Sequence, residues 1–573
     1  MSETKKQQYM WPSRWSKPTA HGDCGAVSSN NIYATRAGLE MLRAGGNAFD
    51  AAVAVSLTLA VVEPHHSGIG GGSFSLLYSA RDQKTVALDA RGVAPIHAKE
   101  DLFIKDGEVQ DEWKDLGGQS VAIPSLLKAM DTVLKEYGTM TLKQVAAPAI
   151  RCAREGFGTS FTGALTMEDD SVQRKLRLSE SFRRLYLKPD GSYYRFGEKQ
   201  TNPELADLLE KVANEGVEAF YTGPIAQHMV DLINARGGCF VPEDFSSYQP
   251  KYRTPVKTTY RGLEVVAFAP PSGGCAVVEM LNILEHNDLA AMGHNTAASI
   301  HAIAEAMKLG FADRSVALGD PDFVQVDVER LTSKRHADER FALSSPDAAG
   351  EYAPAEGIEA KEYPGNTSHF AVMDRFGNAF SQTQTVRDWF GCGIVADGCG
   401  FVLNNAMSDF SAKPGALTSQ GLAYGSANRI QGGKTPLSSM APSMVFQDGR
   451  PFLAIGAAGG PRIITGTVQG IVNAVDFGML PEQLVRMPYI NCLTRDQGLE
   501  LEFGISEDTI RLLEAKGHKP VRVPVDKAMS TMLNSVMYVD GQYHAAGTQR
   551  VDGCGGALLS DGHVVLDGIS QED

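Results

Sequence analysis

The sequence predicts an α+β protein in which strands from both halves of the chain form the sheets and helices cover them. Apolar residues recur at helical spacing through most of residues 31–343, whereas alternating strand patterns dominate from residue 368 onward. The chain has 573 residues, of which 43% are hydrophobic, and it contains no low-complexity tract. It can therefore bury a large core, either as about three domains or as one multilayer domain.

Charge and composition exclude several classes of partner. Lys and Arg number 53 against 68 Asp and Glu, so the formal net charge is −15, and such a surface repels nucleic acid and anionic membranes. The longest apolar run, Ala51–Val62, is too short to cross a bilayer, which needs about 20 residues. The first residues lack an apolar secretory core, and the eight scattered cysteines form no CxxC pair. We therefore expect a cytoplasmic protein with reduced, mostly buried thiols.

The first elements lead into a glycine-rich turn. Asn31–Arg43 is predicted to be a helix that ends at Gly45-Gly46-Asn47. Ala51–Val62 is apolar on every side, which is typical of a fully buried helix. The glycine-rich segment 65–73 then enters a strand over Phe74–Tyr78, and Thr85–Asp89 is its predicted hairpin partner.

The middle of the chain is predicted to be mainly helical from Gly118 to Leu343. The clearest amphipathic segments are Leu126–Glu136, Pro224–Ala235 and Ala297–Ala312. Ser345–Pro364 has no apolar period and is rich in Ala, Gly, Glu and Pro, so we interpret it as an exposed linker or an ordinary long surface loop.

A β-hairpin follows the linker directly. Ser368–Met373 and Ala379–Val386 alternate as strands on either side of the turn at residues 374–378. The remaining sequence mixes strands with glycine-rich loops, among them Gly459-Gly460. The hairpin is therefore predicted to lie in a sheet to which both halves of the chain contribute.

Several catalytic motifs are absent or incomplete. No GxSxG occurs, which excludes the nucleophile elbow of α/β-hydrolases. Gly433-Lys434-Thr435 resembles the end of a P-loop, but Asn428 stands where that loop requires glycine. Gly68–Gly72 lies between a helix and a strand, the reverse of the order in a dinucleotide-binding loop.

His65 and His66 are the most visible candidates for metal ligands. Adjacent residues are expected to point apart, and no third ligand stands at a useful spacing. We therefore interpret both as hydrogen-bonded structural histidines and predict no metal site here.

Thr367 is a candidate for an unusual kind of nucleophile, because it begins a strand directly after the linker. Cleavage between Asn366 and Thr367 would give one residue both a hydroxyl and a free α-amine. An α-amine has a pKa of about 7.7–8.0, so it can act as a base near neutral pH without a histidine. Taken alone, this signal is weak, because threonine is common at the start of a strand and a purely structural role is then the favoured interpretation.

The chain resembles the γ-glutamyltransferase family of N-terminal-nucleophile hydrolases over almost its whole length. Eight segments, in order, carry the resemblance: Gly45–Ala54 (GGNAFDAAVA), Glu63–Phe74 (EPHHSGIGGGSF), Asp89–Pro95 (DARGVAP), Thr367–Asp374 (TSHFAVMD), Phe390–Val395 (FGCGIV), Leu403–Gly415 (LNNAMSDFSAKPG), Lys434–Ser443 (KTPLSSMAPS) and Ala457–Thr465 (AAGGPRIIT).

The resemblance implies a four-layer αββα sandwich, with two stacked antiparallel sheets between helical layers. It implies autocleavage into a large subunit, residues 1–366, and a small catalytic subunit, residues 367–573. The two subunits would form one domain as a heterodimer, and whether this assembles into a higher oligomer stays open. It further implies a small-molecule amide substrate and no metal or organic cofactor.

The resemblance also assigns roles to individual residues. Thr367 would be the cleavage residue and the nucleophile, and Thr385 would hydrogen-bond its hydroxyl. Gly459 and Gly460 would donate backbone N–H groups to the oxyanion. A second set would bind the acyl part of the substrate: Arg91, Ser438 and Ser439 its carboxylate, and Asp409 the α-ammonium of a glutamyl group. Each of these residues also has a purely structural interpretation, such as a surface ion pair for Arg91 or a turn cap for Asp409.

Two positions depart from the family pattern. Arg387 stands where the family has Asn, and Ala406 where it has Gln or Glu, and both family residues help to hold the α-amino group. A permanent cation at Arg387 disfavours an ammonium nearby and favours a second carboxylate, unless the side chain points to solvent or pairs with Asp388. The first expectation is therefore hydrolysis or transfer of γ-glutamyl amides such as glutathione. The alternatives are an acylase for glutaryl or other small carboxylated amides, and a non-catalytic binding scaffold.

Overall fold

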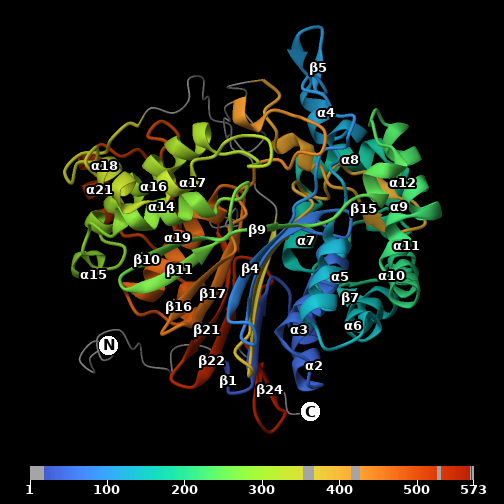
Figure 1. Cartoon of the computed structure of the whole chain (residues 1–573), viewed down its shortest axis with the longest axis horizontal. Coiled ribbons are helices and arrows are strands. Elements are labelled where there is room, and N and C mark those ends of the chain that lie inside the picture. Colours follow the sequence, from blue (N-terminus) through green and yellow to red (C-terminus); the bar gives the residue numbers. More distant parts are fainter. Residues whose placement is uncertain (1–18, 353–366, 414–425, 525–530, 568, 571–573) are drawn as a thin grey trace.

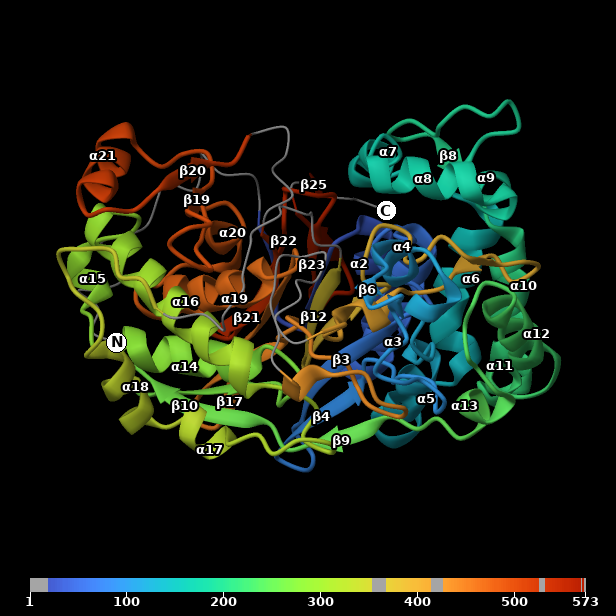
Figure 2. The ribbon, with the colours of Figure 1, turned by 90° about the horizontal axis from the view of Figure 1, so that it is seen from above.

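The computed structural model describes residues 19–352, 367–413, 426–524, 531–567 and 569–570. Among these residues, two large antiparallel sheets are stacked face to face, and helices cover the outer face of each (Figure 1). Figure 2 shows the two helical layers on opposite sides of the stacked sheets. The predicted four-layer αββα sandwich is confirmed.

The first sheet combines strands from both sides of residue 366. Its strand order is β25-β24-β23-β2-β12-β13-β3-β4-β9. The strands are β2 (Gly25–Ser29), β3 (Gly72–Ser79), β4 (Lys84–Ala90), β9 (Lys251–Arg253), β12 (Ser368–Asp374), β13 (Ala379–Thr385), β23 (Cys554–Leu558), β24 (Val564–Leu566) and β25 (Ile569–Ser570). The two predicted subunits therefore interleave within one sheet, while their separation by cleavage stays a prediction.

The second sheet has the strand order β1-β22-β21-β17-β16-β11-β10. Its strands are β1 (Ala20–Gly22), β10 (Val256–Tyr260), β11 (Leu263–Ala267), β16 (Ser443–Gln447), β17 (Arg450–Ala458), β21 (Met532–Val539) and β22 (Gln542–Gly547). Short strands outside the two large sheets are β5 (Ile104–Lys105), β6 (Glu108–Val109), β7 (Phe157–Gly158), β8 (Lys199–Gln200), β14 (Val395–Ala396), β15 (Phe401–Val402), β18 (Ile490–Asn491), β19 (Leu499–Leu501) and β20 (Pro520–Arg522).

One helical layer packs on the nine-stranded sheet and the other on the seven-stranded sheet (Figure 1). The first layer and its periphery contain α2 (Ile32–Arg43), α3 (Ala48–Val62), α4 (Asp111–Asp115), α5 (Leu126–Tyr137), α6 (Leu142–Glu155), α7 (Phe161–Thr166), α8 (Asp170–Leu178), α9 (Glu180–Tyr186), α10 (Pro203–Glu215), α11 (Glu218–Tyr221), α12 (Gly223–Asn234) and α13 (Pro242–Ser246). The second contains α14 (Gly274–Leu284), α15 (Leu289–Met292), α16 (Ala297–Ala317), α17 (Val328–Leu331), α18 (Lys334–Phe341), α19 (Arg462–Val475), α20 (Pro481–Leu484) and α21 (Glu507–Ala515).

Strand β12 shows why the sandwich has a core on each side of the nine-stranded sheet. All of its residues are buried, and successive side chains point to opposite faces. Phe370 and Val372 pack into the cluster that lies under α2, α3, α5 and α6. Ala371 and Met373 pack into the cluster shared with the seven-stranded sheet. The strand that follows Thr367 is therefore fixed from both faces.

The sequence located most of the early elements correctly. Helix α2 begins after Asn31, whose side chain accepts a hydrogen bond from the N–H of Tyr33, and α3 is buried along its whole length. Strands β3 and β4 form the predicted hairpin, as do β12 and β13. In the part of the chain that the structure describes, no helix is long and apolar enough to span a bilayer.

Two expectations about the chain order were incomplete. The region predicted to be mainly helical also contains β9, β10 and β11, because β10 is a short, half-exposed edge strand whose pattern gives little signal. The strand-rich C-terminal part contains α19, a buried helix of 14 residues that begins after Gly459-Gly460-Pro461. The glycines that predicted a loop are the turn that starts this helix.

Candidate active site

Thr367 lies at the amino end of β12, in the middle of the nine-stranded sheet. The residue is 4% exposed, and its hydroxyl donates a hydrogen bond to Oγ1 of Thr385, with 3.5 Å between the oxygens. Asn366, the residue before the predicted cleavage point, lies outside the described residues. The structure therefore places a buried hydroxyl at the first described position after the linker.

Thr385 ends β13, the neighbouring strand, and links Thr367 to the residues beyond it. Its Oγ1 accepts a hydrogen bond from the backbone N–H of Arg387 at 2.7 Å. A Cβ atom at Gly71 would collide with the carbonyl oxygen of Thr385, so the glycine-rich turn after α3 can pack directly against this strand end. The turn is thus a support for the site and not a phosphate-binding loop.

Gly459 and Gly460 form the turn between β17 and α19. Their φ angles are 124° and 62°, a region that residues with side chains rarely adopt. His369, two residues after Thr367, packs on Gly456, where a Cβ would lie 2.6 Å from Nδ1 of the imidazole. The carboxyl end of β17 therefore lies at the same end of the sandwich as the amino end of β12, as an oxyanion-binding role for the two glycines requires.

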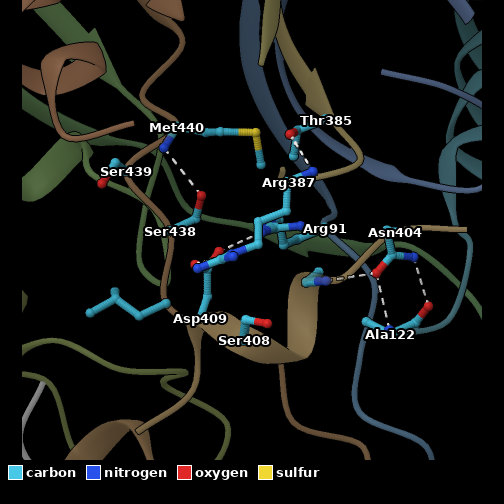
Figure 3. Close-up of polar contacts among 12 residues, drawn as sticks. Arg91, Ala122, Thr385, Arg387, Asn404, Ser408, Asp409, Ser438, Ser439 and Met440 are labelled. Carbon is cyan, nitrogen blue, oxygen red and sulfur yellow. Dashed lines mark hydrogen bonds and ion pairs between the residues drawn. The ribbon is translucent and has the colours of Figure 1, made fainter. Parts of the chain in front are cut away.

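Arg91 and Asp409 form a buried ion pair beside the strand ends (Figure 3). Nη2 of Arg91 lies 2.6 Å from Oδ2 of Asp409, although 318 residues separate them in the sequence. Burial lowers the pKa of Arg91, with Asp409 opposing this shift, and an arginine remains charged in either case. Among the described residues, Nε and Nη1 of Arg91 have no hydrogen-bond partner. These buried donors can bind a carboxylate.

Arg387 does not point to solvent, since its side chain is only 1% exposed. Its Nε lies 3.0 Å from Oδ1 of Asp409, and Nη1 also pairs with Asp388. Its φ angle is 82°, an uncommon backbone conformation for a residue with a side chain. Holding a residue in such a conformation costs about 1–3 kcal/mol, and residues strained in this way cluster at functional sites. The alternative that Arg387 pairs with Asp388 is therefore confirmed, whereas its binding of a second substrate carboxylate stays a prediction.

Ser438 and Ser439 lie on the loop before β16, but they face different partners. Figure 3 shows Ser438 next to the Arg91–Asp409 pair, where its hydroxyl accepts a hydrogen bond from the N–H of Met440 at 3.2 Å. Ser439 points away from the pair in the same view, and its hydroxyl accepts from Nη2 of Arg314 at 3.3 Å. The geometry thus places Ser438, more directly than Ser439, where it can bind the carboxylate proposed for Arg91.

Two supporting residues were not identified from the sequence. Asn405 accepts a hydrogen bond from the N–H of Asp388 and donates one to its carboxylate, which holds the partner of Arg387 in place. Arg314 reaches Ser439 from helix α16. Asn405 stands four residues before Asp409 within a matched segment and could have been noticed, whereas nothing in the sequence around Arg314 indicates its role.

The expectation that the adjacent side chains of His65 and His66 point apart was wrong. The two rings lie side by side with centroids 4.4 Å apart, and Glu63 brings a carboxylate to them. One ligand atom from each of the three residues lies within 4.8 Å of the others. Neither ring nitrogen of His66 has a hydrogen-bond partner among the described residues, so His66 is not the hydrogen-bonded histidine that the sequence suggested.

An αββα sandwich with a buried threonine at the start of a central strand defines the class of N-terminal-nucleophile hydrolases. A family model described as gamma-glutamyltranspeptidase matches residues 34–557. The chain therefore belongs to the gamma-glutamyltranspeptidase family, and the prediction of an enzyme of this family is confirmed.

Relatives and solved structures support this assignment. A glutathione hydrolase proenzyme from Escherichia coli is 37% identical over 92% of this chain and 90% of its own length. An acylase ACY 1 proenzyme from a Pseudomonas strain is 35% identical over 94% of each chain. Cephalosporin acylase from Bacillus halodurans superposes with a TM-score of 0.84 at 27% identity, over 96% of this chain and 98% of its own. The proenzyme names fit the predicted processing into subunits.

Proposed function

We propose that this chain is an autoprocessing amidohydrolase and acyltransferase that cleaves amides of carboxylate-bearing acyl groups. After cleavage at Asn366–Thr367, the α-amine of Thr367 takes the proton of its own hydroxyl. The oxygen attacks the amide carbonyl, and the N–H groups of Gly459 and Gly460 stabilise the oxyanion. Loss of the amine leaves an acyl group on Thr367, which water hydrolyses or an acceptor amine removes.

One continuous chain of contacts supports this proposal. The Thr367 hydroxyl contacts Thr385, Thr385 binds the backbone of Arg387, Arg387 pairs with Asp409, and Asp409 pairs with Arg91. The nucleophile and the charged cluster are thus parts of one network, which a non-catalytic scaffold does not require. An acyl group attached at Thr367 can therefore place a terminal carboxylate near Arg91.

γ-Glutamyl amides such as glutathione are the first candidate substrates. The free donors of Arg91 and the position of Ser438 suit the carboxylate of such a group, and Asp409 supplies an acid for its ammonium. Relatives named glutathione hydrolase support this candidate.

Glutaryl amides, which lack the ammonium, are the second candidate, and the charges around Asp409 favour them. Both carboxylate oxygens of Asp409 are held by arginines, Oδ2 by Arg91 and Oδ1 by Arg387. An ammonium that entered here would lie beside two permanent cations and share one acid with them. Ala406, which is buried, provides no additional acceptor. The relatives named acylase support this second candidate.

Replacing Arg387 with asparagine is expected to shift the preference toward γ-glutamyl amides. The substitution removes one cation from Asp409, and asparagine tolerates the positive φ at this position. We expect the ratio of kcat/KM for γ-glutamyl over glutaryl p-nitroanilide to rise about tenfold, which corresponds to about 1.4 kcal/mol. Steady-state kinetics on the two substrates measure this ratio.

Arg387→Lys is the matched control, because it keeps the positive charge and the backbone strain but loses the planar guanidinium group with its paired N–H donors. Its ratio should stay within a factor of three of the wild-type value. If Arg387→Asn leaves the ratio unchanged, the side chain does not select the acyl group.

The wild-type protein itself provides the first test of the proposed function. An intact mass spectrum should show two polypeptides that meet between Asn366 and Thr367 in place of the 61.5 kDa chain. The cleaved protein should then release amine from γ-glutamyl or glutaryl p-nitroanilide. A chain that stays whole and inactive would favour the scaffold alternative.

We also propose that the protein works in the cytoplasm. All eight cysteines of the sequence lie in the described ranges and are free thiols, which suits a reducing compartment. Fractionation of the native host with an antibody against the protein tests this, and recovery from the periplasm or medium would contradict it. The mass of the protein in solution will show whether the heterodimer forms a larger assembly.

A further inference from the structure

Glu63, His65 and His66 form a buried cluster in the turn that follows α3, on the side of β12 away from the seven-stranded sheet. The three side chains bring one carboxylate oxygen and two imidazole nitrogens to within 4.8 Å of one another. All three residues are at most 2% exposed. No step of the proposed reaction uses them.

Several polar atoms of this cluster lack the partners that burial normally requires. Nε2 of His65 and both ring nitrogens of His66 have no hydrogen-bond partner among the residues that the structure describes. A buried polar group without a partner costs about 1–3 kcal/mol, so three such atoms at one place are unfavourable unless a ligand satisfies some of them.

The carboxylate of Glu63 lacks a cationic partner. Its described hydrogen-bond partners are neutral: Nδ2 of Asn31 at 3.3 Å, the hydroxyl of Ser368 at 3.4 Å, and the side chain of Asn30. No described lysine or arginine forms an ion pair with it, and Asp552, whose charge also acts on it, is another acid. A buried carboxyl group without a cationic partner is held in its neutral form, and a bound cation would take the place of its proton.

We propose that Glu63, His65 and His66 bind one divalent transition-metal ion of the Zn²⁺ class. Two imidazole nitrogens and one carboxylate oxygen are ligands that Zn²⁺ binds at about 2.0–2.2 Å, with water at the remaining position. Such ligand atoms lie roughly 3.3–3.6 Å apart around the ion, so the present cluster needs only small side-chain rotations to close.

A pocket lies on the side of His65. This residue lines the pocket together with Val62, Pro64, Thr159, Ser160 and Phe390. Gly163 lies against the ring, where a Cβ would lie 3.3 Å from Cε1 of His65. The pocket therefore borders the cluster on the side of His65.

The position of the cluster indicates a structural role for the ion. The carbonyl oxygens of His66 and His65 accept hydrogen bonds from the N–H groups of Val386 and Phe390, both at 3.2 Å. Glu63 contacts Ser368, the residue after the nucleophile. An ion here would fix the turn that supports the segment carrying Thr385 and Arg387, without contacting the reacting atoms.

Two other His and acid clusters lie in the described part of the chain, and in each of them a histidine nitrogen already has a partner. In the first cluster, Nδ1 of His301 is hydrogen-bonded to Nε2 of His518 at 2.8 Å. Nζ of Lys308 lies 2.7 Å from Oε1 of Glu305 and forms an ion pair with it. In the second, Nε2 of His336 is bonded to Asp313 at 2.7 Å. These clusters serve as internal comparisons, because a metal would have to displace existing bonds there.

Titration with Co²⁺ tests the proposal on the full-length protein after treatment with a chelator. Co²⁺ occupies Zn²⁺ sites, and its visible absorption reports the ligands and their number. We expect one Co²⁺ per chain with an intense four- or five-coordinate spectrum, displaced by one equivalent of Zn²⁺. We also expect Zn²⁺ to raise the Tm of the stripped protein, because an ion that binds only the folded state stabilises it.

His65→Gln and His66→Gln should each weaken Co²⁺ binding at least tenfold, whereas His301→Gln, the matched control in the cluster with His518, should not. Circular dichroism shows whether each variant folds. If His66→Gln fails to fold, His65→Gln, at the pocket side, carries the same test.

The proposal is overturned if the wild-type protein takes up no Co²⁺, or if His301→Gln rather than the His65 and His66 variants removes the bound ion. This outcome is independent of the catalytic proposal, because the readout is metal and not activity.

Discussion

Thr367→Ala is expected to leave a single uncut chain with no measurable amide cleavage. The variant lacks the hydroxyl that the proposed mechanism uses twice, once to cut the chain and once to attack the substrate. Loss of a nucleophile in comparable enzymes lowers kcat by about 10⁴–10⁶-fold. Intact mass spectrometry measures the first effect, and release of p-nitroaniline from a carboxylated anilide measures the second.

Two variants separate this result from a loss of folding. Thr367→Ser keeps a hydroxyl and should retain cleavage and part of the activity. Thr467→Ala removes a buried threonine hydroxyl from α19, where it contacts only the carbonyl oxygen of Ile463 at 2.7 Å, and should behave as wild type. An active, cleaved Thr367→Ala protein would contradict the mechanism.

Arg91→Gln is expected to cause the second largest loss, a fall in kcat/KM of about 10²–10³-fold for glutaryl or γ-glutamyl anilides. Arg91 is the buried cation with unpartnered donors, and removing it would leave the substrate carboxylate desolvated and unpaired. Truncating one partner of a buried charge pair costs about 2–5 kcal/mol. Most of the effect should appear in KM, because the carboxylate is bound in both the ground state and the transition state.

The matching anilide without the carboxylate, butyryl p-nitroanilide, provides an internal control in the same preparation. Its slow cleavage should change less than threefold in Arg91→Gln, so the substrate with the carboxylate loses its advantage. Arg261→Gln removes a partly buried arginine that pairs with Asp476 on the β10–β11 turn, and should leave both rates unchanged. Equal losses on both anilides would show that Arg91 maintains structure and does not bind the carboxylate.

The sequence by itself determined the fold class, the two hairpins and a buried helix over Ala51–Val62, which in the structure begins at Ala48, and it predicted Thr367 as the nucleophile. These features are local or nearly so. Alternating residues set which faces of β12 are buried, and a linker followed by a threonine at a strand start is visible in one short segment. The ordered segments shared with a known family then predicted the site residues, of which Thr367 and Thr385 are hydrogen-bonded in the structure.

Only the tertiary structure decided which charges meet. Arg91 and Asp409 stand 318 residues apart, and nothing in their separate surroundings shows that Arg387 takes the other oxygen of the same carboxylate. The same holds for Glu63, His65 and His66, where backbone turns bring adjacent side chains together against the expectation from spacing. Periodicity reports which face of an element is apolar, whereas the pairing of polar atoms depends on how whole layers pack, because a hydrogen bond or ion pair needs its atoms placed to within a few tenths of an ångström.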